Sequence, residues 1–216
     1  DHWCDELKET GYLHNHARMW FASIWIFTLR LPWELGADFF LNHLIDGDAA
    51  ANTLSWRWVG GLHTKGKSYL ARPSNIAQFT DGRFEPVGQL SPTAEPLVED
   101  IDHPYVPLSP AQPMPQGEYL LLITSEDCQP ETFIKGAQIG VLGLLPLSDP
   151  KQSAQVRAFE KGAVQDAFSR SGQKTATASS TQDWGANLIE AAQKAGTNQI
   201  ITPWAAIGPV ATQLDA

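Results

Sequence analysis

The chain has 216 residues, of which 43% are hydrophobic, and it carries a formal net charge of −9 at pH 7. A chain of this length forms one or two domains, and its apolar content is sufficient for a globular core. The longest apolar run, Met19 to Leu29, covers about 11 residues, whereas a membrane-spanning helix needs about 20. The composition therefore excludes a transmembrane helix at this run and indicates a buried core helix.

The two cysteines, Cys4 and Cys128, lie far apart in the sequence, which indicates neither a disulfide framework nor a metal site. We therefore expect no bound metal and a location in the reducing cytoplasm. Six of the eight tryptophans precede residue 60, which predicts two differently built halves. Because the chain begins with Asp rather than Met and has no signal peptide, we interpret it as part of a longer protein.

The N-terminal half is predicted to be helical. Helix formers and apolar stripes predict three helices, at residues 12–31, 33–44 and 48–59. Pro32 cannot continue the first helix and suits the first turn of the next. Asp48 is a candidate cap for the third helix, and Gly60-Gly61 is expected to end it. Short connections between apolar helices predict a packed helical domain over residues 1–84.

A local basic segment follows the third predicted helix. Residues 56–80 contain four cationic side chains and no carboxylate, namely Arg57, Lys65, Lys67 and Arg72. Such a patch can meet a phosphate backbone even in an acidic chain. The alternative is a solvated basic loop, and we expect irregular structure over residues 62–84.

The second half has a different character. Residues 85–117 contain eight of the 15 prolines and are predicted to form an extended linker or a wrapped arm. Residues 118–216 are predicted to form a small parallel α/β domain, because apolar strands (YLLLIT, IGVLGLLPL and NQIITPW) alternate with helices. Those helices are expected at residues 148–170 and 181–195. This half has no GxGxxG or Walker motif, and the sequence does not assign its role.

One face of the third predicted helix is polar within apolar surroundings. Asp48, Asn52 and Trp56 are spaced i, i+4 and i+8, so they share that face. A buried carboxylate and amide need partners, since an unsatisfied polar group costs about 1–3 kcal/mol. The face therefore indicates either a ligand site or a capping Asp48 with an internally bonded Asn52.

A second group lies on the first predicted helix. Asn15 and Met19 are spaced i, i+4, and Arg18 lies on the adjoining face. A guanidinium beside a long apolar run needs a carboxylate partner. Asp46 or Asp48 is the natural candidate, and the alternative to a ligand site is a structural Arg–Asp brace between helices.

These segments resemble the FAD-binding helical domain of the photolyase and cryptochrome family. The resemblance rests on TGYLHNHARM, Trp33, LIDGDAAAN and WRW at matching separations, and it covers about residues 7–60 and more loosely extends to 84. It implies an all-helical segment that binds FAD, followed here by the Pro-rich linker and the α/β domain. It also implies light-driven electron transfer from reduced flavin, which splits pyrimidine dimers in DNA.

The resemblance assigns flavin-site roles by position. Arg18 would pair with Asp46 beside the flavin, while Asp46, Gly47 and Asp48 match the segment that lines FAD. Asn52 matches the residue that faces flavin N5 and tunes the flavin redox state. Trp56 and Trp33 match the first two tryptophans of the electron relay, and the third would precede residue 1.

The resemblance also assigns a DNA side to the site. Asn15 and Met19 match the pair found in cyclobutane-dimer enzymes, and Trp58 matches an aromatic that packs against the flipped dimer. His16 stands where an arginine often contacts DNA, and Leu54-Ser55 replace a smaller pair. We expect an enzyme of the deoxyribodipyrimidine photo-lyase type acting on dimer-containing DNA. The alternatives are a cryptochrome-like blue-light sensor, or an interaction module joined to a degenerate flavin domain.

Overall fold

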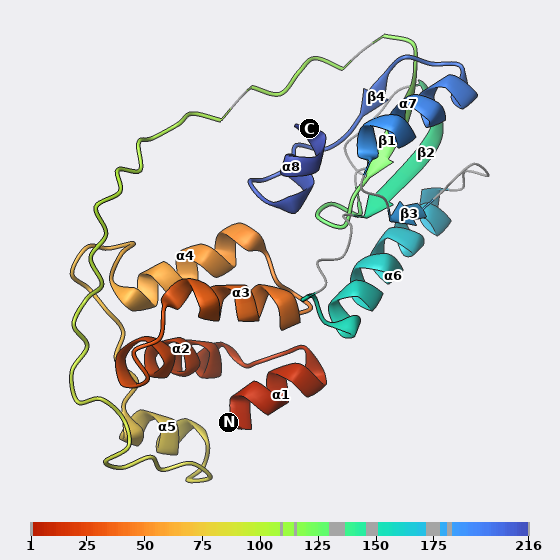
Figure 1. Cartoon of the computed structure of the whole chain (residues 1–216). Coiled ribbons are helices and arrows are strands. Elements are labelled where there is room, and N and C mark those ends of the chain that lie inside the picture. The colour runs from red at the N-terminus through yellow and green to blue at the C-terminus, as the bar shows by residue number, and fades with distance from the viewer. Residues whose placement is uncertain are drawn as a thin grey trace. The chain divides into compact units, whose positions relative to one another are not determined.

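The structure is a computed structural model of the whole chain, which folds as two compact units, Asp1–Tyr105 and Val106–Ala216. It describes residues 2–108, 110–114, 116–129, 137–145, 151–171, 178–180 and 183–215, with the backbone alone at 137–145 and 178–180. We describe each unit by itself (Figure 1).

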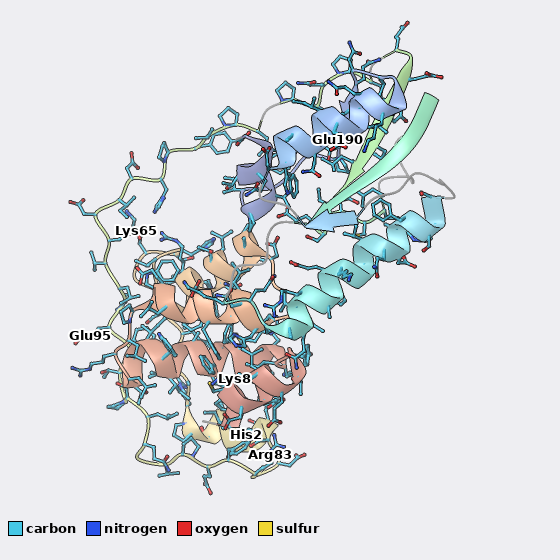
Figure 2. All side chains as sticks on the ribbon, turned by 45° about the vertical axis from the view of Figure 1, so that its right-hand side comes forward. His2, Lys8, Lys65, Arg83, Glu95 and Glu190 are labelled. Atoms are coloured by element: carbon cyan, nitrogen blue, oxygen red, sulfur yellow. The ribbon has the colours of Figure 1, made fainter. Side chains whose placement is uncertain are left out.

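The first unit is helical (Figure 1). Its elements are α1 (His2–Thr10), α2 (Asn15–Ser23), the π-helical η1 (Ile24–Thr28), α3 (Trp33–His43), α4 (Ala49–Gly60) and α5 (Pro73–Phe79). Their apolar faces meet in one core, in which Leu7, Trp20, Phe40 and Ile76 are buried. Charged side chains such as Lys65 and Glu95 are exposed and project into solvent (Figure 2).

The first predicted helix was too long. The chain becomes helical only at Asn15, after His14 accepts a hydrogen bond from the His16 amide at 3.2 Å. At Ile24 the helix widens into a π-turn, in which the Leu29 amide donates to the Ile24 carbonyl at 2.9 Å. A π-turn inserts one residue per turn, so it rotates the side chains that follow.

The second and third helices match the predicted ranges closely. Pro32 precedes α3, and Asp48 caps α4 through a hydrogen bond from the Ala51 amide to its Oδ1 at 2.6 Å. Gly61 ends α4 in the left-handed region with φ +85°, where glycine is favoured. The predicted irregular segment 62–84 was wrong in part, because Pro73 starts the short helix α5 and Ile76 anchors it in the core.

The start of the Pro-rich segment packs against the helical unit. The Leu97 amide donates to the Gly60 carbonyl at 2.8 Å, and the Ser91 amide donates to Thr28 Oγ1 at 3.0 Å. Arg57 donates to both carboxylate oxygens of Glu99. These contacts hold residues 91–99 against α4 and η1 as an arm.

The Arg57–Glu99 pair makes the free energy of unfolding of this unit depend on pH in the acidic range. The hydrogen bonds from Arg57 lower the pKa of Glu99 from its ordinary 4.5 to about 2. A lowered pKa contributes stability above the ordinary value, and this contribution is lost as pH falls towards the folded value. We expect the free energy of unfolding to decrease between about pH 4.5 and pH 2, as measured by urea denaturation at each pH.

A matched pair of variants isolates this contribution. Glu99→Gln removes the titrating group and is expected to flatten the pH dependence between these limits. Glu95→Gln alters an exposed carboxylate in the same arm and is expected to preserve it. An equal slope in wild type and Glu99→Gln would contradict the assignment.

The second unit contains a small parallel sheet. Its elements are β1 (Glu118–Ile123), β2 (Ala137–Leu145), α6 (Ala154–Ser171), β3 (Ala178–Ser180), α7 (Trp184–Ala195), β4 (Ile200–Ile201) and α8 (Pro209–Leu214). The strand order is β3-β2-β1-β4, and every pair is parallel. The predicted parallel α/β layer is therefore present, while β3 and α8 were not predicted. The predicted helix starts at Ser148 and Thr181 lie outside the described residues.

Alternate residues of β1 pack on opposite faces of the sheet. Tyr119, Leu121 and Ile123 share a core with α6, which contributes Val164 and Phe168. Leu122 instead packs in a second cluster with Trp184 and Val210. Across the described residues no helix combines the length and apolarity that crossing a membrane requires.

Candidate functional site

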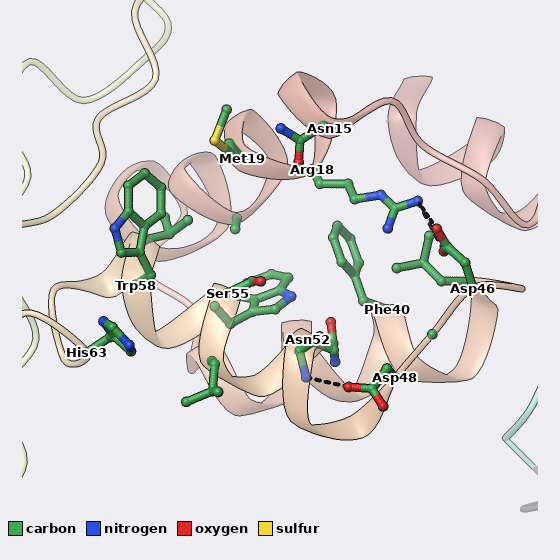
Figure 3. A pocket seen from close by; sticks show the side chains of 17 residues that line it. Asn15, Arg18, Met19, Phe40, Asp46, Asp48, Asn52, Ser55, Trp58 and His63 are labelled. Carbon is green, nitrogen blue, oxygen red and sulfur yellow. Dashed lines mark hydrogen bonds and ion pairs between the residues drawn. The ribbon is translucent and has the colours of Figure 1, made fainter. Parts of the chain in front are cut away.

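A pocket of about 510 Å³ lies in the helical unit among residues of α2, α3 and α4 (Figure 3). Its volume falls within the roughly 300–1,000 Å³ of typical ligand pockets. Its lining mixes amides, an ion pair, aromatic rings and aliphatic side chains; it comprises Asn15, Arg18, Met19, Ala22, Phe40, Leu44, Asp46, Gly47, Asp48, Ala51, Asn52, Leu54, Ser55, Trp56, Trp58, Val59 and His63. Separate helices thus bring both predicted groups of residues to one cavity.

The polar face of α4 lines this pocket. Trp56 is 2% exposed, Asn52 is half-buried, and Asp48 is exposed. The Asn52 Nδ2 donates to the Ala37 carbonyl of α3 at 2.8 Å, so its amide oxygen is the atom presented to the pocket (Figure 3). The expectation of a buried carboxylate was wrong for Asp48, because the pocket is open to solvent at the start of α4.

Arg18 pairs with Asp46 rather than Asp48. The Arg18 Nη2 donates to both carboxylate oxygens of Asp46, at 2.9 and 3.1 Å, and Arg18 Nε donates to the Leu13 carbonyl at 2.8 Å. Both side chains are accessible, with 26% of the Arg18 and 52% of the Asp46 side chain exposed. The pair therefore lies at the rim of the pocket and not in the core. Its surface exposure also limits its contribution to stability, to about 0–1 kcal/mol.

Two of the predicted DNA-side residues, Met19 and Trp58, lie towards the other end of the pocket, while Asn15 lies beside Arg18. Met19 and Trp58 lie near one another in Figure 3, opposite the Arg18–Asp46 pair. Trp58 is 42% exposed, and its ring stacks with Tyr69 at 5.8 Å. One flat aromatic face is thus held in place beside the cavity.

Two predicted site residues do not line the pocket. His16 stacks on Trp20 at 5.7 Å and contacts the exposed Phe79 at 4.5 Å. Trp33 is half-buried, and the Arg57 guanidinium lies 5.7 Å from its ring centroid. Trp33 and Gly36 both belong to α3, and it is Gly36 that packs closely on Trp56.

The Trp56 indole is enclosed by aromatic rings. Phe40, Phe21 and Trp25 meet it edge-on at centroid distances of 5.1, 6.3 and 6.3 Å. Its Nε1 is buried and has no hydrogen-bond partner within the described part of the chain. An unsatisfied buried donor of this kind costs free energy, because it has given up its hydrogen bond to water without replacing it.

Sequence reasoning missed several lining residues. Phe40, Leu44 and His63 were given no role in the predicted site. His63 enters the pocket lining because Gly61 reverses the chain after α4. The end of the helix was predictable from Gly60-Gly61, whereas the path of the chain after it, which brings His63 to the pocket, was not.

The Asp48 cap gives a direct test of how the pocket is built. Asp48→Ala is expected to lower the free energy of unfolding by about 1 kcal/mol, because the Ala51 amide loses its acceptor. Asp48→Asn should retain most of the stability, since asparagine caps equally well. Chemical denaturation of both variants separates the cap from the charge, and equal losses would contradict the capping role.

Together these features define a helical domain with a cofactor-sized pocket whose wall carries a buried tryptophan. The family described as the FAD binding domain of DNA photolyase matches residues 1–107. This part of the chain therefore belongs to the photolyase family, in which the domain binds FAD.

Relatives that carry the name deoxyribodipyrimidine photo-lyase agree. The chain is 31% identical to the protein of Vibrio cholerae over 101 residues, which cover 47% of this chain and 21% of the relative. It is 31% identical to that of Escherichia coli over 100 residues, which cover 45% of this chain and 21% of the relative. It is 48% identical to that of Streptomyces griseus over 59 residues, which cover 27% of this chain and 13% of the relative. The matches thus span about a fifth or less of each relative, and no solved structure matches the chain.

The pocket residues fit a flavin. A flavin ring offers hydrogen-bonding edges and a flat apolar face, and the pocket supplies matching groups. The Asn52 amide oxygen can meet a polar edge of the ring, while Phe40 and Leu44 supply apolar contact. Ala51 lines the pocket next to Asn52 with a small side chain.

Proposed function

We propose that the protein is a light-dependent photolyase that repairs cyclobutane pyrimidine dimers in DNA with FAD. The observation that supports this most is the shared pocket. Residues matching a flavin site (Asp48, Asn52 and Trp56) and residues matching a dimer site (Asn15 and Trp58) line the same cavity. A cofactor and a base held there would be in contact without a large rearrangement of the backbone.

FAD supplies the chemistry of photolyases, namely light absorption and transfer of one electron to the dimer and back. The protein residues position the two partners. Arg18 and Asp46 connect α2 to the turn before α4, which fixes the end of the pocket where Asp48 lies. Asn52 is anchored on α3 and presents its oxygen to the ring. Because both ends are anchored, the pocket is preorganised for the cofactor.

Trp56 serves as the electron donor that restores the reduced cofactor in this proposal. Its burial excludes water, and its ring contacts lead towards the surface. Trp33, which matches the second relay position, follows from the resemblance alone.

On the DNA side, Trp58 offers a face on which an extruded base can stack, since base flipping requires such a surface. Met19 lies near Trp58, and Asn15 lines the same pocket beside Arg18. The exposed Lys65 and Lys67 follow α4 and provide positive charge for a phosphate backbone. The free thiols of Cys4 and Cys128 support the proposed cytoplasmic location.

The second candidate is a blue-light sensor that binds FAD without repair. The position of His16 favours it. The ring packs between Trp20 and Phe79 and does not line the pocket, so the residue that replaces a DNA-contacting arginine is held within an aromatic stack.

One experiment separates the candidates. The whole protein is purified, its flavin absorbance is recorded, and it is illuminated with single-stranded DNA that contains cyclobutane dimers. Disappearance of dimers only in the light is expected. Bound flavin with intact dimers would favour the sensor, and a protein that binds no flavin would exclude both functions.

A further inference from the structure

The aromatic contacts of Trp56 lead to a tryptophan that lies outside the expected relay. The Trp25 ring lies 6.3 Å from the Trp56 ring, nearly perpendicular at 86°. Phe21 stacks on Trp25 at 5.9 Å and also meets Trp56 at 6.3 Å, so the three rings form one cluster. Trp25 is half-buried and thus connects the fully buried Trp56 with solvent.

The environment of Trp25 favours loss of an electron. Oxidation leaves a positive charge on the indole and makes its N–H a stronger donor. The Trp25 Nε1 donates to the Pro32 carbonyl at 2.8 Å, and such a hydrogen bond strengthens when the donor becomes charged. The carbonyl oxygen therefore stabilises the oxidised form of Trp25.

The environment of Trp33 has the opposite character. The cationic Arg57 guanidinium lies 5.7 Å from the Trp33 ring centroid, and a second positive charge on that ring would be repelled. Glu99 pairs with Arg57 and offsets part of this repulsion. Of the two tryptophans, Trp25 therefore lies in the more favourable electrostatic surroundings for oxidation.

The π-turn explains how Trp25 reaches this position. The extra residue in η1 rotates the side chains after Ser23 relative to a regular α-helix. The chain then returns, the Leu31 amide donates to the Trp25 carbonyl at 3.1 Å, and the Pro32 carbonyl meets the indole N–H. Helix irregularity and chain reversal together fix the ring beside Trp56.

We infer that Trp25 is an electron donor to Trp56, and so forms a second outlet of the relay. The inference rests on the proposed light-driven function, in which Trp56 would give one electron to bound FAD. Trp25 then gives one electron to oxidised Trp56 and is itself oxidised. A thiol in solution returns one electron to Trp25, which is half exposed, and the thiol is oxidised.

The test measures photoreduction of flavin in the whole FAD-loaded protein under blue light, with dithiothreitol and without DNA. Trp25→Phe, Trp33→Phe, the double variant and Trp56→Phe are compared with wild type. Trp3→Phe is the matched control, because Trp3 contacts Trp20 and Phe84 and makes no ring contact with Trp56. We expect a severalfold loss of rate in Trp25→Phe, a smaller loss in Trp33→Phe, and no loss in the control.

Two further measurements do not depend on turnover. Peptide mass spectrometry after illumination without thiol is expected to locate oxidation products at Trp25 in wild type. Circular dichroism of the flavin-free protein is expected to lose a tryptophan exciton signal in Trp25→Phe, but not in Trp33→Phe. Loss of this signal with an unchanged far-ultraviolet helical spectrum shows that the variant has lost the Trp25–Trp56 pair and remains folded.

The possible results distinguish failure of the Trp25 role from failure of the proposed light-driven function. A slow Trp56→Phe with a wild-type rate in Trp25→Phe would overturn only the role of Trp25. Unchanged rates in Trp56→Phe and Trp25→Phe would overturn the light-driven relay and this inference together. A protein that does not repair dimers could still show the role of Trp25, because photoreduction of the flavin is measured without DNA.

Discussion

Gly36→Ala is expected to lower the free energy of unfolding of the helical unit by about 1–3 kcal/mol, the usual cost of overpacking a core. A Cβ at position 36 would lie within 3.0 Å of three ring carbons of Trp56. Trp56 is 2% exposed and is enclosed by Phe21, Trp25 and Phe40. The ring can move only by displacing these neighbours or by entering the pocket.

A competing effect has the opposite sign. Gly36 lies inside α3, and alanine is favoured over glycine in a helix interior by about 1 kcal/mol. The clash prevails because it involves a rigid ring, whereas flexible side chains could turn away. A ring displaced towards the pocket would also reduce flavin affinity, so both stability and cofactor binding should decrease.

The chain offers a matched control for this substitution. Gly162 lies within α6, and a Cβ there would meet nothing within 4 Å. Gly162→Ala is therefore expected to be neutral or to stabilise its unit by up to about 1 kcal/mol. Urea denaturation and flavin retention on gel filtration measure both variants. A Gly36→Ala protein as stable as wild type would contradict the close packing of α3 on Trp56.

Local rules predicted the parts of this site that depend on neighbours in sequence. The Asp48 cap and the glycine end of α4 follow from backbone geometry within a few residues. The common face of Asp48, Asn52 and Trp56 follows from the helical repeat alone. The resemblance added Asp46 as the partner of Arg18 and assigned Met19 and Trp58 to the DNA side. The structure brings these residues to one cavity.

Features that depend on packing between distant segments were not predictable. The sequence suggested a buried Arg18 because an apolar run follows it, but the guanidinium lies at a solvent-accessible rim. The contact of Gly36 with Trp56 joins two helices, and a lone glycine in a helical pattern gives no sign of it. The π-turn at Ile24–Thr28 was likewise not predicted, because no local propensity specifies one extra residue in a helical turn.

Trp56→Phe is expected to have the largest effect on function and a small effect on stability. Truncating a buried indole costs about 1–3 kcal/mol of packing. The Trp56 Nε1 has no described partner, and removing an unsatisfied buried donor relieves a penalty of about 1–3 kcal/mol. These contributions nearly cancel, so the variant should unfold at a urea concentration close to that of wild type.

Photoreduction is expected to decrease at least tenfold in the same variant, because phenylalanine is far harder to oxidise than tryptophan and the other electron donors then lie farther from the pocket. The rate is followed by the bleaching of oxidised flavin under blue light. Trp3→Phe, which makes the same chemical change at a ring packed against Trp20, should retain the wild-type rate. If Trp56→Phe is equally fast while its flavin content is normal, electrons reach the cofactor by another route, and Trp56 serves only to pack the wall of the pocket.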